Sequence, residues 1–252
     1  MSSVSESGAR ILAILDLFTE NRPDWTPEQM MQALGYARPT LYRYLKTLKD
    51  AGYLISYPGQ GYVLGPRVTE LDFLMQRADP IITLGTPFLR MLAQRYPCSV
   101  FITRWYGRKI LCIASEVSNP APKSSYPRGR PMPLGRGAIS HVLFANLPRK
   151  EQDAVLQEYH PDLSVAGHEH VLAQWRDIRR DGVSVAYGEV TPGVVGVAAP
   201  ILAGDRMPVA ALCLTSNAAD MDPARLSAIR ADIRDSAAAL SEALRTELRD
   251  TA

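Results

Sequence analysis

The stretch from residue 34 to residue 48 constrains this chain most, because it combines a glycine turn with a strongly amphipathic helix pattern. Its apolar side chains gather on one side of a helical wheel, and they are Leu41, Tyr44, Leu45 and Leu48. One face therefore packs on a core, while the polar and basic face stays free to contact a partner. The φ of proline is helical and its missing N–H has no partner in a first turn, so the sequence predicts a helix that begins near Pro39.

The residue before this proline is unusual for a helix start. Arg38 should be the capping residue, yet capping positions favour Ser, Thr, Asp or Asn. An arginine at a position where local stability favours another side chain is interpreted here as a contact residue.

The segments on either side complete a recognisable arrangement. Upstream, the run Thr26-Pro27-Glu28-Gln29 has the spacing of a capping box and predicts a second short helix that ends at Gly35. Two helices joined by a tight turn with glycine are typical of a helix-turn-helix, whose second helix enters the DNA major groove. Downstream, residues 52–57 and 61–64 are β-like runs that flank Pro58-Gly59-Gln60, which predicts a hairpin, or wing.

These motifs resemble the winged helix-turn-helix of the IclR family of bacterial transcriptional regulators. In the first part of the chain the resemblance is carried by Arg38-x-Thr40-x-x-Arg43-x-Leu45, Ala51-Gly52-Tyr53-Leu54 and Tyr62-x-Leu64-Gly65-Pro66-Arg67. It continues in Pro133-Leu134, Ile178-Arg179-Arg180-Asp181-Gly182, Gly188-Glu189-x-x-Pro192-Gly193 and Val197-Ala198-Ala199-Pro200-Ile201, so it covers nearly the whole chain. The sequence departs from the family at Pro39, where Ser or Thr is usual.

The charge pattern agrees with a local DNA-binding surface. The chain has 252 residues, 46% hydrophobic and 21% charged, with a formal net charge of only +2. The whole-chain balance therefore does not indicate a nucleic-acid partner. Between residues 36 and 67, however, Arg38, Arg43, Lys46, Lys49 and Arg67 stand against Asp50 alone. A solvated helix face is the alternative interpretation.

The DNA-contact residues are expected on the free face of the second helix and on the wing. They are Arg38, Pro39, Thr40, Tyr42, Arg43, Lys46, Gln60 and Tyr62. Arginine can form a bidentate pair with guanine, whereas a lysine such as Lys46 neutralises a phosphate. For Tyr42, packing against the wing is an equally weighted alternative.

Helices are expected at both ends of this first domain. Residues 1–7 are expected to be disordered, and residues 9–18 to form a helix that covers the helix pair. After the wing, a linker helix should end at Asp79-Pro80. The apolar stripe of this helix consists of Val68, Leu71, Leu74 and Met75. It is the proposed seam of a homodimer or of a dimer of dimers, and packing of the stripe on its own domain is the alternative.

The second half predicts an α+β domain. Helices are expected at about 81–96, 138–146, 148–159 and 171–181, with a last one from Asp222-Pro223 onward. Strands are expected at 99–105, 109–115, 183–187, 194–201 and 209–215, which gives helices around one antiparallel sheet. The proline-rich stretch from Asn119 to Pro133 should be a long loop without regular structure. The family resemblance implies that this domain is GAF-like and binds an effector.

The expected domain limits follow from this pattern. They are a winged helix-turn-helix DNA-binding domain at 1–66, the linker helix at 67–79 and the effector-binding domain at 80–252.

The resemblance also implies an effector pocket on one side of the sheet. Its expected lining comprises Arg130, Leu134, Gly135, Arg136, Ser140, Ala186, Val194, Gly196, Leu212 and Cys213. The strand positions are small or apolar, so an anion would be recognised by the arginines, Ser140 and backbone amides near Gly135 to Gly137. This favours an aromatic or otherwise sizeable carboxylate over a two- or three-carbon acid. The alternative is that these are only core residues.

Other functional classes find little support. Cys112, or Ser140 with His141, could be nucleophiles, but no nucleophile elbow, phosphate-binding loop or zincin helix accompanies them, so no catalytic residue is expected. His168-Glu169-His170 is interpreted as an exposed extended segment, since two ligands do not close a zinc site; no metal and no cofactor is expected.

The location of the protein is predicted from its cysteines and its hydropathy. Cys98, Cys112 and Cys213 are interpreted as buried, reduced thiols. No signal peptide or transmembrane run is recognised, so a cytoplasmic protein without membrane contact is expected.

The sequence therefore predicts a ligand-responsive transcriptional regulator that binds double-stranded operator DNA and controls a catabolic operon. The alternative is a GAF-like metabolite-sensing or catalytic module whose winged helix mediates protein contacts.

Overall fold

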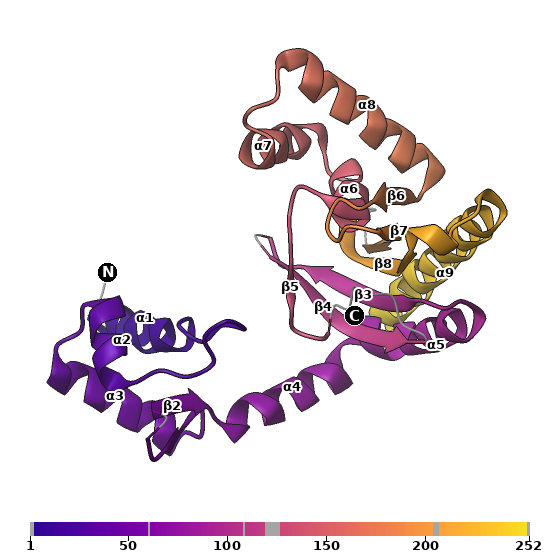
Figure 1. Ribbon diagram of the computed structural model, residues 1–252. Helices are drawn as coiled ribbons and strands as arrows, with labels where there is room; N and C mark the ends of the chain where they lie inside the picture. The colour runs from indigo at the N-terminus through magenta and orange to yellow at the C-terminus, as the bar shows by residue number, and fades with distance from the viewer. Residues whose placement is uncertain (1–2, 60, 108, 119–126, 204–206, 251–252) are drawn as a thin grey trace. The chain divides into compact units, whose positions relative to one another are not determined.

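The chain forms two compact units in a computed structural model, Met1–Ala78 and Asp79–Ala252 (Figure 1). The structure describes residues 3–59, 61–107, 109–118, 127–203 and 207–250. In these parts every helix is too short or too polar to cross a lipid bilayer. The two units are described separately.

The first unit is a bundle of three helices followed by a hairpin and a fourth helix. Its elements are α1 (Ser3–Leu15), α2 (Pro27–Leu34), α3 (Arg38–Asp50), β1 (Leu54–Tyr57), β2 (Gly61–Leu64) and α4 (Pro66–Ala78). The expectation of disorder up to residue 7 is wrong, because α1 already begins at Ser3; it also ends at Leu15 and not at Phe18. The expected hairpin is confirmed, with β1 and β2 antiparallel and Leu54 opposite Leu64.

The predicted helix-turn-helix is confirmed in its local chemistry. The Thr26 hydroxyl accepts a hydrogen bond from the Gln29 N–H at 3.4 Å, and the Gln29 side chain accepts one from the Thr26 N–H at 3.1 Å. Gly35 ends α2 in the left-handed conformation with a φ of 67°, which glycine adopts without steric cost.

The predicted start of α3 is wrong by one residue. Ala37 is the capping residue, so Arg38 is the first helical position and Pro39 the second. Proline is tolerated in either place, because the first N–H groups of a helix have no intrahelical partner.

The core of the first unit is built from the apolar stripe expected on α3 together with residues of α1, α2 and β1. Its largest fully buried side chains are Ile14, Met30, Leu41, Leu45 and Leu54. By contrast, α4 has no buried residue, and the side chains of Phe73, Leu74 and Met75 are more than half exposed at 57%, 53% and 53%.

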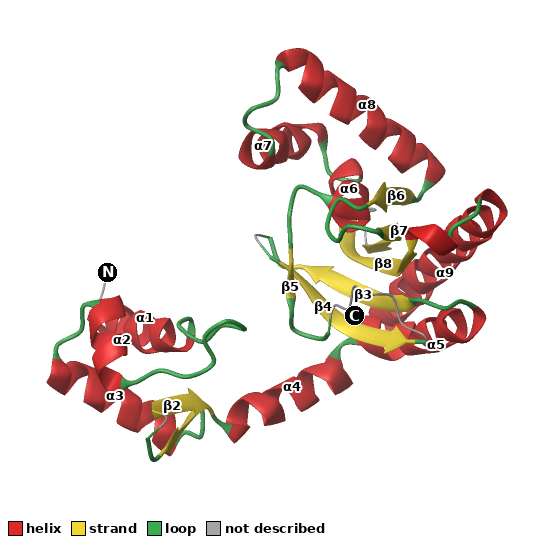
Figure 2. Cartoon of the chain, in the orientation of Figure 1, coloured by secondary structure: helices red, strands yellow, loops and turns green. Residues whose placement is uncertain are grey.

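The second unit is a six-stranded antiparallel sheet between two layers of helices (Figure 2). The strands lie in the order β5-β4-β3-β8-β7-β6. The strand limits are β3 (Ser99–Trp105), β4 (Ile110–Val117), β5 (Pro131–Met132), β6 (Ser184–Tyr187), β7 (Val194–Ala203) and β8 (Met207–Asn217). The helices are α5 (Pro80–Arg95), α6 (Gly137–Ala145), α7 (Arg149–Tyr159), α8 (Val165–Asp181) and α9 (Pro223–Asp250), with a 3-10 turn at Ala218–Asp220. The predicted α+β class is confirmed.

Each face of this sheet has its own core. Helices α5 and α9 cover one face, where Ile102, Leu212 and Ile233 belong to the same apolar cluster. Helices α6, α7 and α8 lie on the other face, where Phe101 and Cys213 pack with Trp175. Because successive side chains of a strand point to opposite faces, neighbours on β3 and β8 are divided between the two cores.

Two local predictions in this unit are wrong. The stretch up to Pro133 is not wholly irregular, since β5 pairs with β4; proline is tolerated there because β5 is an edge strand. The first part of that stretch, residues 119–126, lies outside the described residues. The helix expected from residue 171 begins at Val165, where the Ser164 side chain accepts a hydrogen bond from the Gly167 N–H at 3.2 Å.

Candidate functional site

The outward face of α3 carries most of the predicted DNA contacts. Arg38, Pro39, Tyr42, Arg43 and Lys46 are exposed, whereas Thr40 is half-buried. The Arg38 guanidinium carbon lies 5.4 Å from the centre of the Tyr42 ring, which orients both groups at the start of the helix. Tyr42 is 39% exposed, so its ring keeps an open surface.

The beginning of α3 offers backbone donors as well. No side chain caps this helix. Pro39 has no N–H and the Leu41 N–H already donates to the Ala37 carbonyl, so the amides of Arg38 and Thr40 are the donors of the first turn. Such a helix start, with its positive dipole end, is suited to a phosphate.

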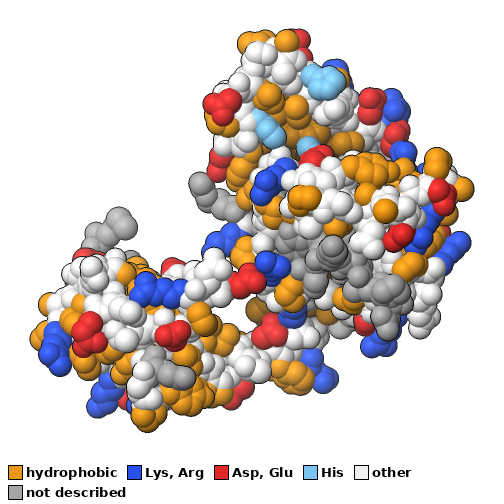
Figure 3. All heavy atoms as spheres, viewed as in Figure 1, with side chains coloured by type: hydrophobic (Ala, Val, Ile, Leu, Met, Phe, Trp, Pro, Cys, Tyr) orange, Lys and Arg blue, Asp and Glu red, His pale blue; other side chains and the backbone are white. Residues whose placement is uncertain are grey.

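The local positive charge is smaller than the sequence count suggests. Arg67 forms an ion pair with Glu70 at 2.8 Å, a residue just outside the counted segment. Lys49 donates a hydrogen bond to the Ser56 hydroxyl at 3.0 Å and so ties α3 to β1. Basic and acidic side chains are also interspersed over the visible face in Figure 3. The exposed basic side chains of α3 that no described partner engages through a hydrogen bond or ion pair to another element are Arg38, Arg43 and Lys46, and they remain the predicted DNA contacts.

The two predicted wing contacts have different outcomes. Gln60 lies outside the described residues. Tyr62 is half-buried and packs against the core of the first unit, and its backbone exchanges two hydrogen bonds with Trp25, at 3.0 and 2.8 Å. Burial raises the pKa of the Tyr62 hydroxyl above its ordinary value, with a smaller contribution from Tyr42. Tyr62 fixes the wing on the helices.

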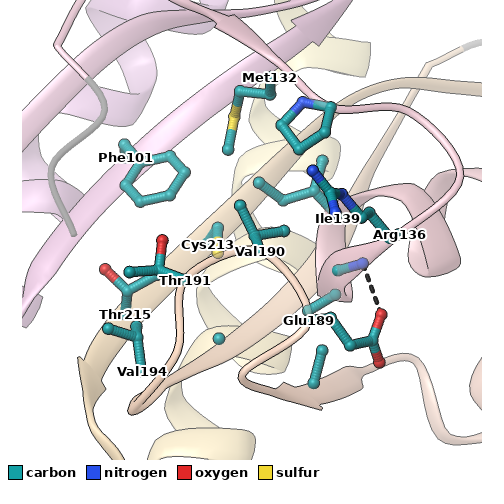
Figure 4. Close-up of a pocket in the computed structure, with 15 residues that line it drawn as sticks. Phe101, Met132, Arg136, Ile139, Glu189, Val190, Thr191, Val194, Cys213 and Thr215 are labelled. Carbon is teal, nitrogen blue, oxygen red and sulfur yellow. Dashed lines mark hydrogen bonds between the residues drawn. The ribbon is translucent and has the colours of Figure 1, made fainter.

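The second unit contains a cavity on the α6 face of the sheet, shown in Figure 4. Its empty space is about 490 Å³ when the part of the mouth open to solvent is included. The part of it open to the centre of a water-sized sphere is about 50 Å³. The lining residues come from the sheet (Phe101, Met132, Ala186, Val194, Gly196, Cys213 and Thr215), from the start of α6 (Pro133, Arg136, Gly137, Ala138 and Ile139) and from the β6–β7 loop (Glu189, Val190 and Thr191).

Half of the pocket residues expected from the sequence line this cavity. They are Arg136, Ala186, Val194, Gly196 and Cys213. Leu212 does not, and its prediction is wrong: it is fully buried on the opposite face of the sheet, with α5 and α9. Cys213 is its neighbour on β8, and a strand cannot direct two adjacent side chains into one pocket.

The remaining predicted residues do not line the cavity. Leu134 packs with the apolar cluster of α6 to α8, and Gly135 is buried against the Tyr159 ring. The Ser140 hydroxyl is fully buried and donates to the Pro133 carbonyl at 3.2 Å, so it supports the α6 start from inside. Arg130 is exposed in the turn before β5.

Several lining residues were missed by the sequence analysis. Phe101 on β3 is paired with Cys213 on β8, so both side chains point to the α6 face. Thr215 lies two residues after Cys213 on β8 and is paired with Ser99, so it points to the same face. An alternation argument applied to β8 would have found Thr215, two residues after Cys213. Glu189 belongs to a motif that the sequence analysis quoted without assigning it a role.

Glu189 changes the electrostatics of the site. One of its carboxylate oxygens, Oε2, accepts hydrogen bonds from the Gly137 N–H at 2.7 Å and from His141 Nε2 at 2.9 Å. The Gly137 N–H, which was expected to bind the anionic group of an effector, is therefore already bonded to the carboxylate of Glu189. Arg136, at the same end of the cavity in Figure 4, is the cation among the lining residues. Burial raises the pKa of the Cys213 thiol far above its ordinary value, so this pocket residue is a neutral thiol.

Histidine side chains are visible in the part of the second unit formed by α7 and α8 (Figure 3). His168 and His170 lie in the first turns of α8, so the extended segment expected there is wrong; His168 Nε2 lies 3.0 Å from the His160 carbonyl. Burial lowers the pKa of His160 below its ordinary value, and the neighbouring His141 lowers it further. In the described part of the chain no three His, Cys, Asp or Glu residues form a group that could hold a metal ion.

Comparisons with known proteins find matches for both parts of the chain. The family description "IclR helix-turn-helix domain" matches residues 7–55, and "Bacterial transcriptional regulator IclR C-terminal" matches residues 74–242. The HTH-type transcriptional regulator XynR of Escherichia coli (strain K12) is 28% identical over 247 residues, which are 96% of this chain and 98% of XynR.

Solved structures show the same fold. An IclR transcriptional regulator of Alicyclobacillus acidocaldarius has a TM-score of 0.82 at 20% identity, covering 94% of this chain and 98% of that one. An IclR homologue of Microbacterium hydrocarbonoxydans, solved in complex with 4-hydroxybenzoate, has a TM-score of 0.78 at 17% identity, covering 95% and 99%.

These matches extend over the DNA-binding and the effector-binding parts of the chain, and the relatives are transcriptional regulators and not enzymes. The chain therefore belongs to the IclR family of bacterial transcriptional regulators.

Proposed function

We propose that this regulator reads its operator with the outward face of α3 and responds to an aromatic carboxylate bound in the cavity between α6 and the sheet. The operon that it controls is then a catabolic one, whose genes act on that compound or its precursors. The single observation that carries the proposal is the composition of the cavity, an apolar floor with Arg136 at one end.

DNA recognition is assigned to residues that the fold leaves exposed. Arg38 and Arg43 are placed to meet base edges, Lys46 to neutralise a phosphate, and Tyr42 to add a ring and a hydroxyl. The uncapped start of α3 supports a phosphate near the amides of Arg38 and Thr40. We infer that Pro39 packs its ring against the DNA backbone, because it has no N–H to donate.

The cavity favours a ligand with one flat apolar part and one anionic group. Phe101, Ile139 and Val194 offer apolar contact. Burying about 150 Å² of an aromatic ring there would contribute about 4 kcal/mol. Thr191 and Thr215 add hydroxyls for a ring substituent, and Arg136 can pair with the carboxylate. The 4-hydroxybenzoate complex of a protein with the same fold supports this ligand class.

We further propose domain limits and an assembly. The DNA-binding domain spans 1–66, the linker helix 67–79 and the effector-binding domain 80–252. Two or four copies associate through the exposed apolar side chains of α4, because one recognition helix covers too few base edges for useful specificity. The protein acts in the cytoplasm, where it meets DNA.

Two measurements test this function. A gel shift with the DNA upstream of the protein's own gene should show sequence-specific, salt-sensitive binding. A thermal-shift screen against aromatic carboxylates should raise the Tm, since a ligand at 100 times its Kd stabilises the native state by about 2.7 kcal/mol. Acetate and other two- or three-carbon acids are the matched controls. Absence of specific DNA binding, or equal Tm shifts with the small acids, would contradict the proposal.

A further inference from the structure

Residues 188–193, which join β6 to β7, form a strap along one wall of the cavity. The strap contributes Glu189, Val190 and Thr191 to the lining (Figure 4). One end is tied to β7, because the Gly188 N–H donates to the Val194 carbonyl at 2.8 Å. The other end is tied to the 3-10 turn after β8, because the Ala218 N–H donates to the Gly193 carbonyl at 2.9 Å.

Between those ends, the side chain of Glu189 joins the strap to α6. The carboxylate of Glu189 accepts from the Gly137 N–H and from His141, two residues one turn apart on α6. A carboxylate at this place is also favoured by the helix dipole, and it supplies the cap that no neighbouring side chain provides. Glu189 is 38% exposed and His141 19% exposed, so water can compete for these bonds.

The His141 ring is itself oriented from behind. Its Nδ1 accepts a hydrogen bond from the Trp175 indole N–H at 3.4 Å, which assigns the ring proton to Nε2, the atom that faces Glu189. Trp175 is 1% exposed and packs edge-to-face on Phe144 at 5.6 Å. The partner of Glu189 is therefore fixed by the core, whereas Glu189 sits on a loop.

The contact between the strap and α6 is close. A Cβ added to Gly137 would lie only 2.7 Å from Cγ2 of Val190, so glycine is needed for the strap to sit where it does. At both ends of the strap, Gly188 and Gly193 have positive φ values of 66° and 76°, and an added Cβ would meet nothing within 4 Å. These two positions have the conformational freedom and the space that hinges require.

We propose that Glu189 is a latch, a positioning residue that holds the strap closed against α6 and so places Val190 and Thr191 in the cavity wall. When the Glu189 bonds break, the strap swings out about Gly188 and Gly193 and the cavity wall opens. The part of this inference that concerns the effector rests on the proposed function: opening of the latch sets the rates at which the aromatic carboxylate enters and leaves.

The latch itself is tested without any ligand, by hydrogen–deuterium exchange of the full chain. Glu189→Ala should raise the exchange rate of peptides covering 187–195 and of the Gly137 amide by about tenfold, because two hydrogen bonds that close the strap are lost. Peptides from α5 and α9, on the other face of the sheet, should exchange as in the wild type. Glu189→Gln keeps a side-chain oxygen that can accept from Gly137 and should restore most of the protection.

The matched control removes the same charge elsewhere. Glu169→Ala changes an exposed residue of α8 and should leave the exchange of the strap at the wild-type rate. Unchanged exchange of 187–195 in Glu189→Ala would overturn the latch. An equal rise in the peptides of α5 and α9 would also overturn it, since Glu189 would then support the whole fold.

A second arm measures the effector. With 4-hydroxybenzoate as the probe, stopped-flow tryptophan fluorescence should show association and dissociation rates that both rise several-fold in Glu189→Ala. Faster exchange of the strap with unchanged ligand rates would overturn the assignment of the strap as the ligand's path. Failure of the wild type to bind the probe counts against the proposed function, while the exchange experiment still decides the latch.

Discussion

One carboxylate oxygen of Asp79 forms an ion pair with Arg104 at 2.6 Å, and the other caps α5 by accepting a hydrogen bond from the Ile81 N–H at 3.0 Å. Asp79 is the first residue of the second unit, and its side chain is only 13% exposed. One carboxylate thus fixes the start of α5 and joins it to β3.

The first prediction concerns the stability of this junction. Asp79→Ala should lower the free energy of unfolding of the second unit by about 1–3 kcal/mol, because a cap and a partly buried ion pair are lost together. Asp79→Asn should cost less, since asparagine still caps. Urea unfolding of the full chain measures both. The control Asp153→Ala removes the exposed ion pair with Arg149 and should change the free energy of unfolding by no more than about 0.5 kcal/mol. An equal loss of stability in all three variants would contradict the role of Asp79 as cap and ion-pair partner.

A second prediction separates base reading from phosphate neutralisation on α3. Arg43→Ala should weaken binding to the specific operator by about 1–3 kcal/mol and relax the preference at one operator position. Lys46→Ala should weaken specific and non-specific binding alike and reduce the slope of log affinity against log salt by about one unit. Both side chains are exposed, so each variant should keep its stability within about 0.5 kcal/mol. Unaltered operator preference in Arg43→Ala would show that the contact face of α3 has been assigned wrongly.

Association through α4 gives the third prediction. Leu74 is 53% exposed, so Leu74→Glu should leave each copy folded while placing a charge in the proposed seam, and sedimentation should show a shift toward monomers. Thr69→Glu puts the same charge on an exposed position about 140° away around α4 and should not alter the assembly. A Leu74→Glu protein that sediments like the wild type would remove α4 from the interface.

The fourth prediction follows from the lowered pKa of His160. Its ordinary value is 6.5, and burial makes the folded chain bind this proton less readily than the unfolded chain. The contribution to stability is therefore present above about pH 6.5 and is lost as the pH falls through the folded pKa. Replacing His160 by phenylalanine should flatten the decline of the unfolding free energy between pH 7 and pH 5, measured by denaturant titration; identical slopes would contradict the assignment.

The first unit could be predicted closely because its signals are local. The capping box of Thr26 and Gln29, and the glycine that ends α2, act within a few residues of one another. The same is true of the apolar stripe of α3. Boundaries were less certain, since Ala37 caps α3 without the side-chain bond that marks a helix start in a sequence. In α8, the apolar period begins near Val171 although Ser164 already caps the helix.

The cavity could be predicted only in part, because it depends on sheet register. The apolar run of β8 predicts a buried strand, but it does not say whether Leu212 or Cys213 faces α6; pairing with β3 decides it. The bond from Gly137 to Glu189 spans 52 residues, and no local pattern announces it. The sequence therefore indicated the floor of the pocket and Arg136 at its end, but not the bond by which the β6–β7 loop contacts α6.

Ligand bound in the cavity is expected to change DNA binding by the same chain. The direct measurement is the affinity of the full-length protein for its upstream operator, by fluorescence anisotropy, with and without the aromatic carboxylate that most raises the Tm. Coupling between ligand binding and DNA binding should change the operator affinity by about 5- to 150-fold.

The matched variant for this measurement is Gly196→Val. An added Cβ at Gly196 would make only ordinary contacts, 3.7 Å to Ala138 and 3.9 Å to Thr215. Because Gly196 lines the cavity, the methyl groups of a valine there are expected to narrow it. The ratio of operator affinities with and without ligand should depart from one in the wild type and return to one in Gly196→Val. A ratio of one in the wild type at saturating ligand, or an unchanged response in the variant, would contradict it.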